Sequence, residues 1–350
     1  MGAVFSAHRE DEDPDFVSFG LVVLDELHFP DKGNLYDVPG GSGSFGTFGA
    51  RIAIPAARSK TVACIIVMGD DFPEAVLKQF QSWALNLLIR KVPGAKSTRG
   101  LLEYKDKAFG RKTFRYLTPP LNTTPELLED SNLLYSASFH FLARPEDLET
   151  QVANLLRRRA ERSKTGRPLL VWEPAPPYCN SRTRTAHLEM CKRVDVFSPN
   201  HLELISLFED HEHIEQPFDR KQVERYARCF LDSSLEESQA GAKIVIRAGE
   251  HGCLFMSNMD EPTWLPTFYD STSVKIVDAT GAGNAFLGAL AITLRRTNDL
   301  KESAIYGSVA ASFALEQIGL PTTSIRRGKE VWNGVEFTAR LMEYRLTLVN

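Results

Sequence analysis

The chain has 350 residues, of which 43% are hydrophobic and 25% charged, a composition typical of a folded globular protein rather than a disordered one. Its formal net charge of −4 gives no general positive field for nucleic acid, so we expect no nucleic acid partner. The longest apolar runs, at residues 62–68 and 285–294, are too short to span a bilayer, and we expect no stable membrane association. The 5 cysteines are scattered without a C-x-x-C pair, which favours a reducing compartment and a cytoplasmic protein.

The expected elements alternate between strands and helices along most of the chain. Residues 1–15 are acidic and are expected to form a disordered tail. Strands are then expected at 16–24, 61–68, 133–135, 168–172, 194–197 and 243–247, and helices at 73–90, 145–159, 201–208 and 221–231. Because helices between successive strands act as crossover connections, this order predicts an α/β fold with a mainly parallel central sheet and helices on both faces.

Residues 100–118 interrupt this alternation. Segments 100–104 and 113–118 alternate like strands and flank a charged stretch that contains a glycine, a pattern that favours a β-hairpin. We interpret the hairpin as part of a small β lid with elements near 28–40 and 96–120. We also expect a homodimer to form through this lid.

A glycine turn joins a strand-like segment to a long apolar helical run near the C-terminus. Residues 278–284 read D-A-T-G-A-G-N, and the helical run follows at 285–295. Such a turn presents backbone N–H groups and the positive end of the helix dipole to an anion such as a phosphoryl group. Gly281 and Gly283 would let the backbone approach a phosphate closely. The alternative interpretation is a plain strand-to-helix turn.

This segment resembles the signature D-T-x-G-A-G-D of the PfkB (ribokinase-like) family of ATP-dependent small-molecule kinases. The resemblance covers most of residues 16–320. Within the family, the sequence is similar to a fungal branch named for maintenance of killer virus. It implies a ribokinase-like three-layer α/β/α core, with Gly281, Ala282 and Gly283 as the anion hole and Asp278 near metal-bound phosphate. The family's final aspartate is the catalytic base, and Asn284 stands in its place.

Residues 198–203, S-P-N-H-L-E, resemble the family segment P-N-x-x-E. The resemblance implies that Asn200 and Glu203 hold waters around a magnesium ion, which keeps much of its hydration shell in proteins. Taken alone, the two residues equally suit a helix cap and a first-turn acid.

Two later segments resemble parts of the family's nucleotide site. Residues 244–252 match the strand and glycine loop beside the nucleotide, with Gly249 and Gly252 at the matching positions. Arg247 stands where the family often has a hydroxyl residue. Ser308, on an expected helix at 304–317, is expected to line the adenine pocket, although small residues there also suit close helix packing.

The substrate end resembles the family less closely. Asp25 corresponds to an aspartate that binds substrate hydroxyls, although it could instead cap a loop or pair with Lys32. Gly40 and Gly41 resemble the glycine pair at the hinge between lid and core. Phe45 falls where sugar kinases commonly have a substrate-contacting asparagine, and because its ring cannot replace the amide's hydrogen bonds, ribose is disfavoured.

Two other motifs are weaker. Residues 41–46 match G-x-G-x-x-G, but a long polar connection precedes them, which argues against a dinucleotide-binding turn. Residues 210–213, D-H-E-H, suggest a metal site, but adjacent residues of a regular helix do not converge on one ion, so a solvated loop is the better interpretation.

The sequence thus predicts a kinase domain at 16–320 and a C-terminal helical extension at 321–350. Its expected activity is transfer of a phosphoryl group from ATP, with Mg²⁺, to a hydroxyl of a sugar, nucleoside or related small molecule. Transfer should be slow, because the neutral amide of Asn284 cannot take a proton. The alternative is a catalytically impaired kinase-like protein that binds a nucleotide or metabolite and acts through a partner.

Overall fold

A computed structural model describes residues 13–30, 33–105, 112–164, 166–209, 217–233, 242–258 and 260–349. The first 12 residues of the expected tail, Lys32 and the D-H-E-H motif lie outside the described residues. Within the described part of the chain, no helix is both long and apolar enough to cross a bilayer.

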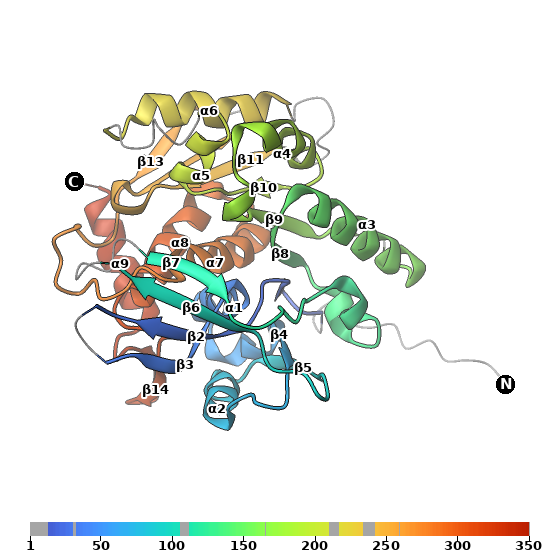
Figure 1. The fold of residues 1–350 in the computed structure, drawn as a ribbon. Coiled ribbons are helices and arrows are strands. Elements are labelled where there is room, and N and C mark those ends of the chain that lie inside the picture. Colours follow the sequence, from blue (N-terminus) through green and yellow to red (C-terminus); the bar gives the residue numbers. More distant parts are fainter. Residues whose placement is uncertain are drawn as a thin grey trace.

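A nine-stranded sheet forms the centre of the molecule (Figure 1). Its strands are parallel from β5 to β11, whereas β12 and β13 run antiparallel at one edge. In spatial order they are β13 (Thr263–Leu265), β12 (Cys253–Ser257), β11 (Lys243–Arg247), β10 (Val196–Phe197), β9 (Leu169–Pro174), β8 (Ser138–Ala143), β1 (Phe16–Ser18), β4 (Val62–Met68) and β5 (Asn86–Lys91). The expected mainly parallel sheet is confirmed.

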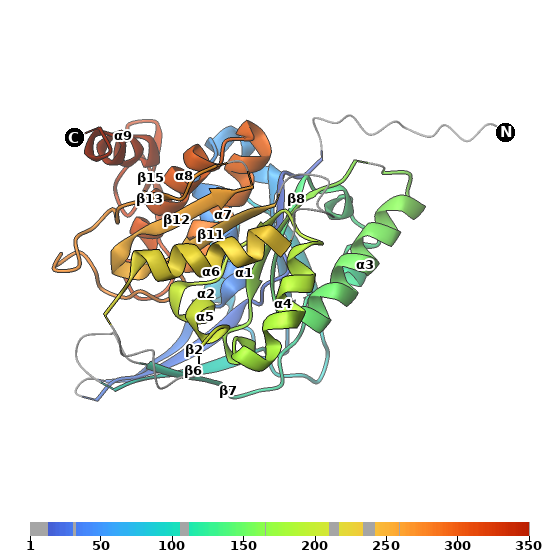
Figure 2. The ribbon, with the colours of Figure 1, turned by 90° about the horizontal axis from the view of Figure 1, so that it is seen from above.

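Helices cover both faces of this sheet (Figure 2). Neighbouring residues of a strand point to opposite faces, and Val62 and Ala63 accordingly belong to two different apolar clusters. One cluster contains side chains of α1 (Ser42–Ile52), α2 (Glu74–Ser82), α7 (Ala282–Thr297), α8 (Leu300–Ala314) and α9 (Phe337–Thr347). The other contains side chains of α3 (Pro145–Glu161), α4 (Arg184–Cys191), α5 (His201–Ser206) and α6 (Arg220–Ser233).

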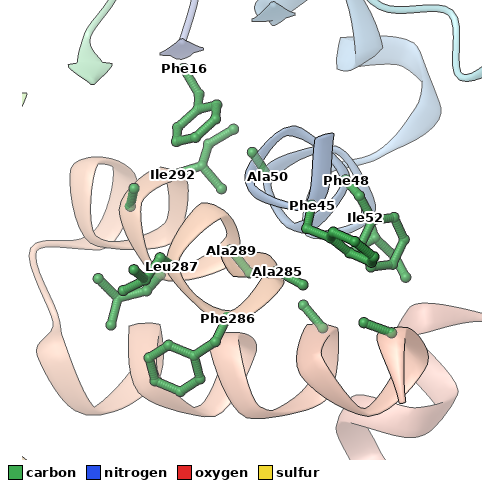
Figure 3. Close-up of a cluster of buried hydrophobic side chains, with 14 of the residues drawn as sticks. Phe16, Phe45, Phe48, Ala50, Ile52, Ala285, Phe286, Leu287, Ala289 and Ile292 are labelled. Atoms are coloured by element: carbon green, nitrogen blue, oxygen red, sulfur yellow. The ribbon is translucent and has the colours of Figure 1, made fainter. Parts of the chain in front are cut away.

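Helices α1 and α7 pack against each other at backbone contact (Figure 3). A Cβ added to Gly49 would overlap the carbonyl of Ala285, and one added to Gly288 would overlap the carbonyl of Gly46. Glycine is therefore required where the helices cross, since any side chain would force them apart.

A second, four-stranded sheet forms the lid, with the order β3 (Leu35–Gly40), β2 (Val23–His28), β6 (Arg99–Tyr104) and β7 (Lys112–Tyr116). The expected pairing of the two segments between residues 100 and 118 is confirmed, because β6 and β7 pair antiparallel from Gly100–Tyr116 to Tyr104–Lys112. Strand β2 joins the two halves by pairing antiparallel with β3 and parallel with β6. Figure 2 shows β2, β6 and β7 along one side of the molecule.

Four expected elements were wrong wholly or in part. The strand-like segment that ends at Asp278 forms turns and irregular structure rather than a strand. The strand expected at 16–24 divides into β1 of the central sheet and β2 of the lid. The chain passes between the two sheets at Gly20, where an added Cβ would lie 2.5 Å from the amide nitrogen of Gly43. The strand expected at 133–135 is a 3₁₀ turn, Asn132–Tyr135, followed by β8. The helix expected at 73–90 ends at Ser82, because Ala84 adopts a positive φ of 56° and the chain continues as β5.

The C-terminal segment contains a hairpin as well as the expected helix. Strands β14 (Thr323–Arg326) and β15 (Lys329–Trp332) pair antiparallel before α9. Trp332, Phe337 and Tyr344 are buried in the same cluster as α1 and α7. The C-terminal segment therefore packs into the main core.

Candidate functional site

The glycine turn at the start of α7 lies between an aromatic ring and a guanidinium group. Gly281 has a φ of 77° and caps the helix, and an added Cβ there would overlap the ring of Phe45. A Cβ added to Gly283 would overlap Nη1 of Arg247. Gly281 is thus required by its positive φ and its contact with the ring, and the first turn of α7 lies beside a cation at Gly283, an arrangement that suits an anion.

The side chain after this turn contacts a buried carboxylate. Asn284 Nδ2 donates to Glu173 Oε2 at 2.5 Å. Arg247 Nη1 forms an ion pair with Glu173 Oε1 at 2.7 Å, and His140 Nε2 lies 3.4 Å from Glu173 Oε2. Burial acts to raise the pKa of Glu173, but the charge of Arg247 and the interaction with His140 outweigh it, so the pKa lies below its ordinary value.

Four residues of this network were not predicted as site residues: Glu173, Arg247, His140 and Ser18. Ser18 Oγ lies 2.9 Å from Nδ1 of His140, which connects β1 to β8 and so to Glu173 on β9. One signal in the sequence could have identified Glu173. It ends an apolar run at the carboxyl end of a parallel strand, where α/β proteins place their ligands.

Asn200 and Glu203 form a reciprocal cap at the start of α5. Glu203 N donates to Asn200 Oδ1 at 2.8 Å, and Asn200 N donates to Glu203 Oε2 at 2.7 Å. Burial raises the pKa of Glu203 to about 7, and nearby Arg247, whose Nη2 is 3.6 Å from Glu203 Oε2, opposes this rise. The cap interpretation is confirmed, and any role with a metal stays a prediction.

Two side chains of this cap are candidates for holding magnesium. The described residues contain no group of three or more His, Cys, Asp or Glu side chains that could hold a metal ion. Asn200 and Glu203 supply one amide and one carboxylate. Such a pair suits a hydrated Mg²⁺ held through water and phosphate oxygens, which is the usual way proteins bind this ion.

Asp278 lies where the lid meets the glycine turn. Its Oδ1 accepts hydrogen bonds from the amide of Thr280 at 3.0 Å and from the Thr280 hydroxyl at 2.7 Å. Its Oδ2 lies 3.1 Å from the hydroxyl of Tyr104, which projects from β6. The carboxylate therefore stabilises the turn and connects it to the lid.

The expected nucleotide residues follow β11 and lie on α8. Gly249, with a φ of 57°, has nothing within 4 Å of an added Cβ, whereas Gly252, with a φ of 87°, would overlap the carbonyl of Leu265. Gly252 is thus fixed by packing, and Gly249 adjoins open space. Ser308 donates to the carbonyl of Ala304 within its helix at 2.9 Å. Their contacts with a nucleotide stay predictions.

At the expected substrate end, Asp25 is buried in β2 between two glycines. An added Cβ at Gly40 would overlap its carboxylate, and one at Gly100 would lie 2.7 Å from Oδ1. Gly41 caps α1 with a φ of 86°. Phe45 is fully buried in the apolar cluster of Figure 3, and its ring lies against Gly281 of the glycine turn. Its contact with a substrate stays a prediction.

Two exposed aromatic residues lie on the lid face that carries Asp25. Phe114 and Tyr116 are 49% and 45% exposed, and their ring centroids are 5.0 Å apart in a T-shaped arrangement. Tyr116 pairs with Gly100, which in turn pairs with Asp25, and directly paired residues project to the same face of a sheet. Tyr104, on the same face, lies 3.1 Å from Asp278 through its hydroxyl, so this face is directed towards the glycine turn.

The model of the pfkB family of carbohydrate kinases matches residues 15–325. The chain belongs to the pfkB family. An uncharacterized protein of Schizosaccharomyces pombe is 30% identical over 348 residues, which is 95% of this chain and 93% of that protein. Protein MAK32 of Saccharomyces cerevisiae is 28% identical over 346 residues, covering 94% of this chain and 91% of its own length. These two relatives agree with the fungal branch indicated by the sequence.

Solved structures show the same fold. A ribokinase from Giardia lamblia superposes with a TM-score of 0.69 at 15% identity, covering 97% of this chain and 100% of its own. An E. coli protein assigned as a ribokinase II, solved with ATP and Mg²⁺, superposes with a TM-score of 0.63 at 16% identity, covering 96% of this pfkB chain and 99% of its own. The ribokinase-like fold expected from the sequence is confirmed.

Proposed function

We propose that this pfkB protein transfers the γ-phosphoryl group of ATP to a hydroxyl group of a small molecule. The observation that carries this proposal is the anion site at the start of α7, where the guanidinium of Arg247 lies against Gly283. Helix amides and a fixed cation stabilise the charge that spreads over the transferred phosphoryl group, which is the main task of a phosphotransfer site.

The nucleotide and ion have residues in suitable positions. ATP would lie along the open space at Gly249, with its phosphates towards Gly281–Gly283. A hydrated Mg²⁺ held by Asn200 and Glu203 would neutralise phosphate charge. The E. coli protein with ATP and Mg²⁺ supports this choice of donor and ion through the shared fold.

For the acceptor, we favour a nucleoside over a free sugar. Asp25 would accept hydrogen bonds from neighbouring hydroxyls. Phe114 and Tyr116, exposed on the same lid face, offer flat apolar surface for a heteroaromatic base, and base–aromatic stacking is worth about 1–3 kcal/mol. A free sugar would leave both rings without such a contact.

Transfer from γ-labelled ATP to a panel of nucleosides, sugars and polyols tests this function. We expect Mg²⁺-dependent labelling of one or more nucleosides, and loss of labelling when the ion is chelated. Phe114→Ala should raise KM for that nucleoside about tenfold with little change in nucleotide affinity. Labelling of no acceptor by folded, ATP-bound protein would contradict the proposal and favour the ligand-binding alternative. Preferential labelling of free sugars would contradict the assignment of the acceptor.

A further inference from the structure

A carboxylate lies one hydrogen bond from Asn284. Because Asn284 Nδ2 is 2.5 Å from Glu173 Oε2, this carboxylate adjoins the side chain that stands where the family signature has its aspartate. The amide of Asn284 cannot accept the proton of a hydroxyl at neutral pH, whereas an ionised carboxylate can. The site therefore contains both an amide and a carboxylate, with the carboxylate carried by β9.

The contacts of Glu173 keep this carboxylate ionised and oriented. It is 5% exposed, and Arg247, His140 and Asn284 approach it from three different elements. Among these neighbours, Arg247 has a second contact, against Gly283 of the anion site. A phosphate bound at the glycine turn would attract this guanidinium, weaken its ion pair with Glu173 and so make Glu173 a stronger base when the donor is in place.

We propose that Glu173 is the general base of the phosphotransfer, with Asn284 as the residue that positions it. This inference rests on the proposed function. As the acceptor oxygen attacks the γ-phosphorus, its proton passes to the Glu173 carboxylate and the new O–P bond forms. The bond from the γ-phosphorus to the bridging oxygen breaks, and its electron pair leaves with ADP. The proton then passes from Glu173 to water after the product has left.

Three variants test the assignment in single-turnover transfer at saturating ATP, Mg²⁺ and acceptor: Glu173→Gln, Asn284→Asp and the double variant. We expect Glu173→Gln to slow transfer at least about 100-fold while nucleotide affinity changes less than about threefold. Asn284→Asp alone places two carboxylates in contact, so one takes up a proton and transfer does not rise. The double variant restores one carboxylate and one amide in exchanged places and should be at least about tenfold faster than Glu173→Gln.

That recovery distinguishes a base from a structural residue, because a lost packing contact at position 173 would not be restored by an acid at position 284. Glu74→Gln, an exposed glutamate of α2, is the matched control and should transfer at the wild-type rate. If Glu173→Gln does not fold, Glu173→Asp is the alternative variant, because it keeps the charge on a side chain that is shorter by one methylene. We expect its transfer rate to fall at least about tenfold while nucleotide binding is retained.

Wild-type rates in Glu173→Gln, or a double variant no faster than it, would overturn the role of Glu173 while leaving the proposed function intact. A rise of tenfold or more in Asn284→Asp alone would likewise overturn it. If the wild-type protein transfers the phosphoryl group to no acceptor, the proposed function is overturned, and the role of Glu173 as general base is overturned with it.

Discussion

Arg247 connects groups from several elements of the site. It pairs with Glu173 at the end of β9, lies 3.6 Å from Glu203 on α5, and donates to the carbonyl of Ser198 at 2.9 Å. The same side chain adjoins the glycine turn of α7. The departure at position 247 was visible in the sequence, but its partners were not, because they are separated by tens of residues and share no spacing. Asn284 was likewise identified without the carboxylate that it contacts.

The buried pair of Arg247 and Glu173 predicts non-additive effects on stability. Arg247→Met leaves the carboxylate without its counter-charge and should lower the free energy of unfolding by about 3–5 kcal/mol. Adding Glu173→Gln removes that unpaired charge, so the double variant should be more stable than the sum of the single changes by at least about 1 kcal/mol. Urea unfolding near pH 7 measures all three. Additive losses would show that the two groups do not depend on each other.

At the scale of elements, the lid is attached to the core by charged groups at its base. Asp71, after β4, accepts from the amide of Ser97 at 2.6 Å and from Arg99 Nε at 2.9 Å. Arg99 begins β6 and also pairs with Asp37 of β3 at 2.7 Å. Two lid strands are thereby fixed to the end of a core strand.

This attachment predicts a dependence of stability on pH. Burial acts to raise the pKa of Asp71, but hydrogen bonds from Ser97 and Arg99 lower it from 3.8 to about 2. Because the folded pKa is depressed, the contribution is present above the unfolded value and is lost as pH falls from about 4 towards 2. Because Asp71 and Arg99 are partly exposed to solvent, their contribution to the free energy of unfolding is only about 1 kcal/mol. Asp71→Asn should lack this part of the loss when urea unfolding is compared at pH 5 and pH 2.5, and an identical acid dependence in both proteins would contradict the assignment.

Elements with one strong pattern were predictable, and those that depend on distant contacts were not. The apolar run of β4 and the glycine turn before α7 have local signals. By contrast, β8 contains the polar residues Ser138 and His140, whose partners come from other segments, and it was missed in favour of the more apolar turn before it. The end of α2 at Ser82 was missed because the apolar residues that follow suit a strand or a helix equally well.

The C-terminal segment supports α1, the helix that follows lid strand β3. Trp332 lies 5.6 Å from Trp83 and 5.3 Å from Phe48 between ring centroids. On the same hairpin, Glu330 forms an ion pair with Arg51 at the end of α1. The expected division into a domain at 16–320 and an extension stays a prediction, but the packing makes the two parts one core.

Trp332→Ala should therefore lower the free energy of unfolding by about 3–5 kcal/mol through loss of buried aromatic contacts. Ile325→Ala is a control on the same hairpin, since this side chain is 67% exposed, and it should change stability by less than about 0.5 kcal/mol. Chemical denaturation followed by tryptophan fluorescence measures both. Equal small effects would mean that the hairpin is dispensable for the fold.

The glycine contacts between α1 and α7 have a consequence for how the acceptor could change. Helix α1 starts beside Asp25 and α7 starts at the anion site, and backbone contact at Gly49 and Gly288 leaves no space for the two helices to shift. We therefore expect the distance between Asp25 and the first turn of α7 to change little whatever molecule is bound. If the proposed phosphotransfer is correct, a selection for altered acceptor specificity should diversify positions 114 and 116 of the lid and leave the helix pair unchanged.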